Sequence, residues 1–161
     1  MLIFLFGEPG TGKNFVGDLL STHFEYYFWD ADLALPLEMK NAIRNKQVFT
    51  QKMRDNYTQM IIGEVKNLQK KYNNIVVAQA LFKEKNRIQI ANQFSEALFI
   101  LIMSSFDKIQ ERLQLRKSLV DNDYAEIIRS EFEEPLLSHK IIFNDSDHAS
   151  IIKQLHLILS R

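Results

Sequence analysis

The stretch Gly7-Glu-Pro-Gly-Thr-Gly-Lys-Asn14 decides how the rest of this chain is interpreted. It contains the pattern Gly-x4-Gly-Lys, with glycines at 7 and 12 followed by Lys13. Glycines let a backbone wrap around an anion with its N–H groups pointing inward, and a helix that begins at such a loop adds the positive end of its dipole. The stretch therefore predicts a phosphate-binding loop, with Lys13 reaching the outer phosphates of a nucleoside triphosphate.

The segments on either side of this loop supply the context that the motif requires. Residues 2–6 are continuously apolar, which is typical of a buried parallel strand. Apolar residues between 15 and 20 recur at helical spacing, which predicts a helix from near Lys13 to near His23. A glycine-rich turn without a ligand is the alternative, and the order strand, loop, helix favours the phosphate loop.

Asn14 departs from the usual form of the motif, in which a Ser or Thr hydroxyl at this position binds the Mg²⁺ of the nucleotide. An asparagine carbonyl oxygen is also a suitable ligand for a hard cation. Three interpretations stay open: Asn14 binds the metal directly, it holds a water of the metal, or the site is weakened in catalysis.

Apolar segments and helical periodicity alternate along the rest of the chain, which predicts a mainly parallel sheet with helices on both faces. We expect a single domain over 1–161, with a helical substrate-binding region at about 33–71 and a lid at about 116–130. Further strands are predicted at 26–29, 74–79, 97–103 and 140–143, and helices within 37–71, where two are expected, and at 84–94, 106–115, 124–132 and 151–159.

The composition is that of a globular chain and excludes several functions. Of 161 residues, 46% are apolar, and 20 basic residues balance 20 acidic ones, so no net field favours nucleic acid or an anionic membrane. Cysteine is absent, which excludes disulfides and thiolate chemistry and suits the cytoplasm. The apolar runs 1–6 and 97–103 are too short for a signal peptide or a membrane span.

Asp30 and Asp32 follow the second predicted strand and form the next candidate site. Residues two apart on an extended chain project to the same side, here toward the carboxyl edge of the sheet where ligands bind. One carboxylate is suited to a metal water and the other to the hydroxyl of a phosphoryl acceptor, as general base. Capping of a following helix by Asp32 is the structural alternative.

Arg112 and Arg116 are four residues apart and therefore lie on one face of a helix that leads into the predicted lid. Arginines in a lid stabilise the charge of a transferring phosphoryl group and exclude water. A solvated face paired with Asp107 or Glu111 is the alternative.

Several separated segments together resemble the gluconate kinases, within the shikimate-kinase-like group of P-loop phosphotransferases. The resemblance extends over nearly the whole chain and implies the three-layer α/β/α P-loop NTPase fold, with five strands in the order 2-3-1-4-5. The segments that carry it are Gly7–Lys13, Tyr27-Phe-Trp-Asp-Ala-Asp-Leu33, Val76-Val-Ala-Gln-Ala-Leu81 followed by Arg87, Glu111-Arg-Leu-Gln-Leu-Arg-Lys117 and Phe132-Glu-Glu-Pro135.

The resemblance implies transfer of the ATP γ-phosphate to a hydroxyl of gluconate, with ATP and Mg²⁺ as cofactors and a homodimer as a possible assembly. The phosphate-loop motif and the resemblance together assign catalysis to Lys13, Asp30 and Arg116, and metal binding to Asn14 and Asp30. The substrate hydroxyls are assigned to Asp32, the substrate carboxylate to Arg87, and a further substrate position to Gln79. The residues assigned to the nucleotide are Gly7, Glu8, Pro9, Gly10, Thr11, Gly12, Lys13, Asn14 and Arg112.

Departures from the gluconate kinase pattern concentrate in the metal and substrate positions. Ala34 and Leu35 stand where a histidine is usual, Gln79 where a Ser or Cys is usual, and the lid lacks Gly-His-Phe. Alternatives are a shikimate or nucleoside-monophosphate kinase, or a catalytically weakened ATP-binding module. Ala78-Gln-Ala-Leu81 lacks the glycine run expected of a shikimate kinase, which disfavours that alternative.

Overall fold

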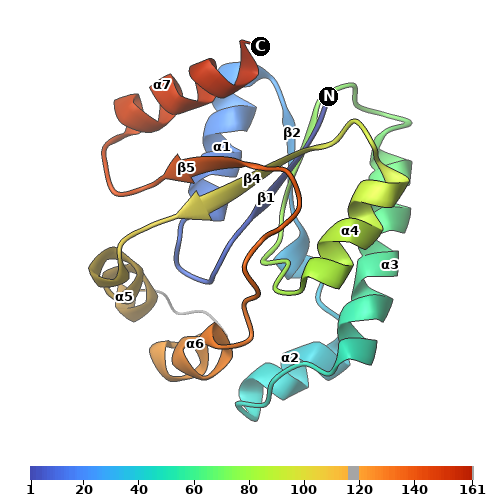
Figure 1. Cartoon of the computed structure of the whole chain (residues 1–161), viewed down its shortest axis with the longest axis vertical. Coiled ribbons are helices and arrows are strands. Elements are labelled where there is room, and N and C mark those ends of the chain that lie inside the picture. The colour runs from blue at the N-terminus through green and yellow to red at the C-terminus, as the bar shows by residue number, and fades with distance from the viewer. Residues whose placement is uncertain (116–119, 161) are drawn as a thin grey trace.

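The computed structural model describes residues 1–115 and 120–160, which form a parallel sheet flanked by helices (Figure 1). The five strands lie in the order β2-β3-β1-β4-β5, and every pairing between them is parallel. The predicted fold class and strand order are thus confirmed. The strands are β1 Leu2–Phe6, β2 Tyr27–Asp30, β3 Ile75–Ala78, β4 Leu98–Met103 and β5 Lys140–Phe143.

Helices cover both faces of the sheet, which explains why the central strand is apolar throughout. Side chains alternate between the faces of a strand, so Phe4 and Phe6 pack with the cluster under α3 and α4, while Ile3 and Leu5 pack with the cluster under α1 and α7 (Figure 1). None of the described helices is long and apolar enough to cross a membrane. These covering helices are α1 Lys13–Phe24, α3 Gln51–Leu68, α4 Glu84–Gln93 and α7 His148–Leu159.

The remaining helices gather beyond the carboxyl ends of the strands, at the bottom of Figure 1. A third apolar cluster joins α2 and α6, because Ile43 of α2, Phe82 after β3, and Tyr124 and Ile128 of α6 pack together. The described part of the predicted lid therefore contacts the predicted substrate region. The elements are the 3₁₀ turn η1 Ala31–Ala34 and the helices α2 Leu37–Arg44, α5 Phe106–Leu115 and α6 Asn122–Arg129.

Two helices begin earlier than apolar periodicity predicts, because aspartates cap them. Asp121 accepts a hydrogen bond of 2.9 Å from the backbone N–H of Tyr124, so α6 begins at Asn122 rather than at 124. Asp147 accepts one of 3.0 Å from the N–H of Ser150, so α7 begins at His148 rather than at 151. Capping residues lie outside the apolar stripe, so periodicity alone does not include them.

Candidate active site

The glycine-rich loop follows β1 and ends at the first residue of α1, and its glycines at 7, 10 and 12 all have a positive φ, at which a side chain is strained. Gly12 has φ 93°, and a Cβ there would lie 2.0 Å from the side-chain nitrogen of Asn144. Gly7 has φ 143°, and its Cβ would lie 2.5 Å from the carbonyl oxygen of Ile102. The loop therefore has the tight conformation that a phosphate cradle needs.

Lys13 is 6% exposed and lies against this loop. Its ammonium donates hydrogen bonds of 3.0 Å to the carbonyl oxygens of both Gly7 and Glu8. The charge is therefore held at the loop, where the phosphates of a nucleotide would lie.

Arg112 of α5 supports the same loop. Its guanidinium lies 3.3 Å from the carbonyl oxygens of Gly10 and Thr11, and it donates a hydrogen bond of 2.6 Å to the carbonyl of Asn144. The side chain of Asn144 in turn donates one of 2.8 Å to the Thr11 carbonyl. Arg112 thus positions the loop, and its contact with a nucleotide stays a prediction.

Asp30 ends β2 and joins three segments of the site. One carboxylate oxygen accepts a hydrogen bond of 3.0 Å from the backbone N–H of Asp32, and the other accepts one of 2.5 Å from the side chain of Asn14. Asp30 rather than Asp32 is thus the residue that caps the following turn. The alternative in which Asp32 serves as a helix cap is wrong, and Asp32 lines the cavity described below.

Asn14 and Asp30 lie together beside the phosphate loop, and the donor set suits Mg²⁺. The described residues contain no group of three or more His, Cys, Asp or Glu side chains that would hold a metal by themselves. Mg²⁺ in kinases is bound by one or two protein oxygens together with phosphate oxygens and water. The amide oxygen of Asn14 and the Asp30 carboxylate fit that pattern.

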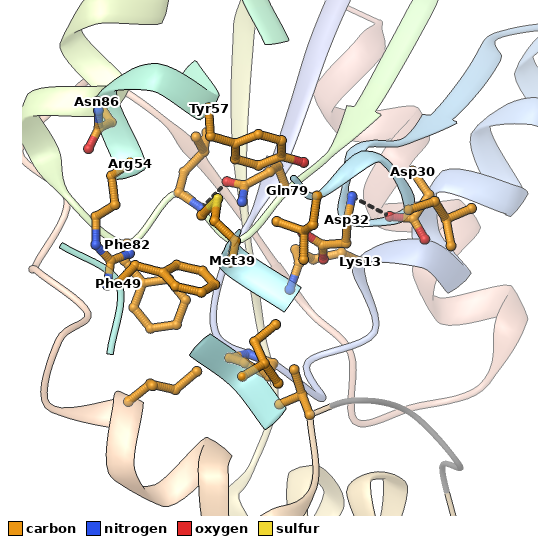
Figure 2. Close-up of a pocket in the computed structure, with 18 of the residues that line it drawn as sticks. Lys13, Asp30, Asp32, Met39, Phe49, Arg54, Tyr57, Gln79, Phe82 and Asn86 are labelled. Carbon is orange, nitrogen blue, oxygen red and sulfur yellow. Dashed lines mark hydrogen bonds between the residues drawn. The ribbon is translucent and has the colours of Figure 1, made fainter. Parts of the chain in front are cut away.

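One cavity of about 430 Å³ extends from the phosphate loop to α3 (Figure 2). Lys13 and Asp32 lie at one end of this cavity, and Arg54 lies at the other, beside Phe49 and Phe82 (Figure 2). The cavity thus has a phosphate end and a cationic end, and a small acceptor has room between them.

Arg54 is a functional candidate that the sequence interpretation missed. It is 8% exposed, and its guanidinium carbon lies 5.5 and 5.2 Å from the ring centres of Phe49 and Phe82. The Glu131 carboxylate is 3.8 Å away, and the Arg54 Nε has no hydrogen-bond partner among the described residues. Burial lowers the pKa of Arg54 and Glu131 opposes that shift. A buried cation with incomplete partners is suited to an anion.

The expectation that Arg87 binds the carboxylate of the substrate is wrong. It is fully buried and is not among the described residues that line the cavity. Its guanidinium donates to the carbonyl oxygens of Leu81, Phe82 and Glu133 at 2.8, 3.1 and 2.8 Å, and to the Glu84 carboxylate at 2.8 Å. All of its nitrogens are used by the protein, so Arg87 ties the turn after β3 to α4.

Gln79 lines the cavity, yet its side-chain oxygen serves the turn after β3. That oxygen accepts a hydrogen bond of 2.5 Å from the N–H of Leu81. Leu81 has φ 48°, a conformation that glycine adopts most easily. Gln79 therefore stabilises a turn for which a glycine run was expected, which removes the main argument against the shikimate kinase alternative.

The predicted lid is described only in part. Arg116 lies outside the described residues, so its catalytic assignment stays a prediction. Arg129, at the end of α6, lies 3.6 Å from the Glu8 carboxylate of the phosphate loop, and its guanidinium covers the ring of Phe106 at 4.4 Å. The described part of the lid thus reaches the phosphate loop.

Comparisons with known proteins agree with this arrangement. The family model described as shikimate kinase matches residues 9–160. A shikimate kinase from Clostridium botulinum (strain Alaska E43 / Type E3) is 28% identical over 162 residues, covering 98% of this chain and 96% of the relative.

Two solved structures show the same fold at lower identity. A sugar kinase from Janibacter sp. HTCC2649 has a TM-score of 0.85 at 13% identity, covering 99% of this chain and 94% of that one. A gluconokinase from Sinorhizobium meliloti 1021 has a TM-score of 0.81 at 19% identity, covering 99% and 91%. The resemblance to the shikimate-kinase-like group is confirmed, whereas membership of the gluconate kinases stays a prediction. The chain belongs to the shikimate kinase family.

Proposed function

We propose that this protein transfers the γ-phosphate of ATP to a hydroxyl group of a small organic acid. One observation carries the proposal: a single cavity joins Lys13 of the phosphate loop to the buried cation Arg54, with Asp32 at the phosphate end. A kinase needs its nucleotide and its acceptor in one space so that the phosphoryl group passes directly between them.

The residues at the phosphate end divide the chemistry between them. The ammonium of Lys13 stabilises the charge on the transferring group. Mg²⁺, held by Asn14 and Asp30, would neutralise phosphate charge when bound. Asp32 orients the acceptor hydroxyl, and a carboxylate of the pair Asp30 and Asp32 accepts its proton.

At the opposite end, Arg54 binds the carboxylate of the acceptor. Its side chain is nine-tenths buried, and the distance of 3.8 Å between its guanidinium and the Glu131 carboxylate is longer than a hydrogen bond. An arginine fork matches a carboxylate in geometry as well as in charge. Arg54 thus takes the role that the resemblance assigned to Arg87.

Shikimate is the first acceptor to test, and gluconate is the second. The family match and the curated relative favour shikimate. The argument for gluconate rests on the resemblance of sequence segments, because the similar gluconokinase structure supports the fold alone. We also propose a cytoplasmic location and assembly as a homodimer.

The experiment is an ADP-release assay with ATP, Mg²⁺ and a panel of hydroxy acids that includes shikimate and gluconate. We expect turnover with at least one acid and none with Lys13→Met. Arg54→Met should raise KM for the acid roughly a hundredfold, because it removes one partner of a buried charged pair, and should leave KM for ATP unchanged.

The matched control is Arg44→Met, because Arg44 is exposed on α2 and its contact is with Asn41 of the same helix. Tight ATP binding without turnover on any acid would contradict the proposed transfer. It would favour the second candidate, an ATP-binding module in which the hydrogen bond from Asn14 to Asp30 replaces metal binding.

A further inference from the structure

We infer that the acceptor is an acid with an apolar, ring-sized body and few hydroxyl groups, rather than a polyhydroxylated acid. This inference rests on the proposed function and concerns the same cavity. Between the phosphate end and Arg54, the wall is mostly aliphatic and aromatic. The described apolar residues that line it include Leu35, Met39, Ile43, Phe49, Leu81 and Phe82.

The hydroxyl groups in this wall are committed to the protein. Tyr57 donates its proton to the carbonyl of Ala31, and Tyr124 donates to the carbonyl of Gln47 at 3.0 Å. Thr58 donates to the carbonyl of Arg54 at 2.8 Å, within α3. A hydroxyl has one proton, so each of these groups offers a ligand nothing more than a lone pair.

The amide side chains in the wall are engaged in part. Asn86 donates a hydrogen bond of 3.0 Å to Asp55 and accepts one of 3.1 Å from Gln51. The side-chain oxygen of Gln79 accepts from the N–H of Leu81, so among these described side chains the amide nitrogen of Gln79 is the donor that stays for a ligand. Because the other groups donate to the protein, a ligand with many hydroxyls would leave several of its hydroxyl oxygens without a donor.

Among the described residues, the side chains that suit a polar ligand are therefore concentrated at the two ends of the cavity. Figure 2 shows Arg54 at one end, Lys13 and Asp32 at the other, and Met39 in the space between them. Such a site fits one anionic group at Arg54 and one hydroxyl at the phosphate end, joined by an apolar body. Specificity then comes from the scarcity of hydrogen-bond donors for additional hydroxyls among the described residues of the wall.

The test measures the binding of three acids to the full chain by calorimetry in the presence of Mg²⁺ and ADP. The acids are 3-hydroxycyclohex-1-ene-1-carboxylate, which has a single hydroxyl, shikimate, which has more on the same ring, and gluconate, with a hydroxyl on every carbon beyond the carboxylate. We expect affinity to fall in that order, with a difference of at least about tenfold between the first and the last.

A substitution in the cavity wall tests whether the wall causes this order of affinities. Leu35 lines the cavity and is half-buried, so Leu35→Asn should narrow the gap between the single-hydroxyl acid and gluconate severalfold by adding a partner for hydroxyls. The matched control is Leu37→Asn, because Leu37 is 67% exposed and lies outside the lining. It should leave the order and the gap unchanged.

The outcomes separate this inference from the proposed function. Binding of gluconate or shikimate as tight as that of the single-hydroxyl acid would overturn the inference and leave phosphoryl transfer to an acid standing. An equal effect of Leu35→Asn and Leu37→Asn would also overturn it. Failure of every acid to bind and to be phosphorylated would overturn the proposed function itself.

Discussion

The side-chain amide of Asn14 donates a hydrogen bond of 2.5 Å to the carboxylate of Asp30 and thereby links the start of α1 to the end of β2. An amide presents its nitrogen and its oxygen in different directions, so the oxygen of Asn14 faces away from Asp30. The residue that departs from the phosphate-loop motif is thus held against the carboxylate proposed to act with Mg²⁺.

Replacement of Asn14 should change how the rate depends on Mg²⁺. Asn14→Leu removes both the amide donor and the oxygen ligand, so we expect the Mg²⁺ concentration for half-maximal rate to rise about tenfold or more, whereas Asn14→Ser should lower it. The measurement is the initial rate over a Mg²⁺ titration. Asn73→Ser, at an exposed position, is the control. An unchanged Mg²⁺ dependence in Asn14→Leu would remove Asn14 from the metal site.

Gly12→Ala should abolish nucleotide binding, because the added Cβ would lie 2.0 Å from the side chain of Asn144 at a φ of 93°. Gly63→Ala in α3 is the matched control, since a Cβ there meets nothing within 4 Å. Alanine in a helix interior should stabilise the fold by about 0.5–1 kcal/mol. Thermal unfolding with and without ADP measures both effects. If ADP raises the Tm of Gly12→Ala as much as it raises the Tm of the wild type, nucleotide binding does not depend on this loop conformation.

Elements of the fold were predictable because their signals are local. The buried run 2–6 and the helical spacing after Lys13 are properties of neighbouring residues, and the structure has β1 and α1 there. The helix starts at Asn122 and His148 were missed by two and three residues, because capping depends on single polar side chains.

The far end of the cavity was not predicted, because it is built from distant segments. Arg54 meets Phe82 and Glu131 only after the chain has folded. One local signal was available: Arg54 lies on the same stripe of its helix as Tyr57 and Ile61, and a charged residue on an apolar stripe is a candidate for a buried role. No comparable signal distinguishes the buried Arg87 from a residue that faces a ligand.

Arg87→Met should unfold the protein more easily rather than weaken acceptor binding. The substitution leaves three backbone carbonyls and the Glu84 carboxylate without their buried partner, so the free energy of unfolding should fall by about 3–5 kcal/mol. Chemical denaturation measures this loss, and KM for the acid, measured at a temperature where the variant is folded, should stay unchanged. A stable Arg87→Met protein with a raised KM would restore the substrate role implied by the resemblance.

Asp145 should make the support of the phosphate loop sensitive to acid. Its carboxylate accepts hydrogen bonds of 2.5 Å from the Ser104 hydroxyl and 2.8 Å from the Ser105 N–H, and these lower its pKa from the ordinary value of 3.8. The folded state thus prefers the charged form. Its contribution to stability is complete above the unfolded pKa and is lost as the pH falls through the lower folded pKa.

The variant Asp145→Asn should therefore be less stable than the wild type by a constant amount between about pH 5 and pH 8, and the gap should close below about pH 4. Urea denaturation of both proteins over that range measures the gap. Ser104 also accepts a hydrogen bond of 2.9 Å from Arg112, which supports the phosphate loop, so the affinity for ADP should fall in the same acidic range. A stability gap that changes near neutral pH would mean that another group is responsible, because the lowered pKa of Asp145 confines its effect to acid.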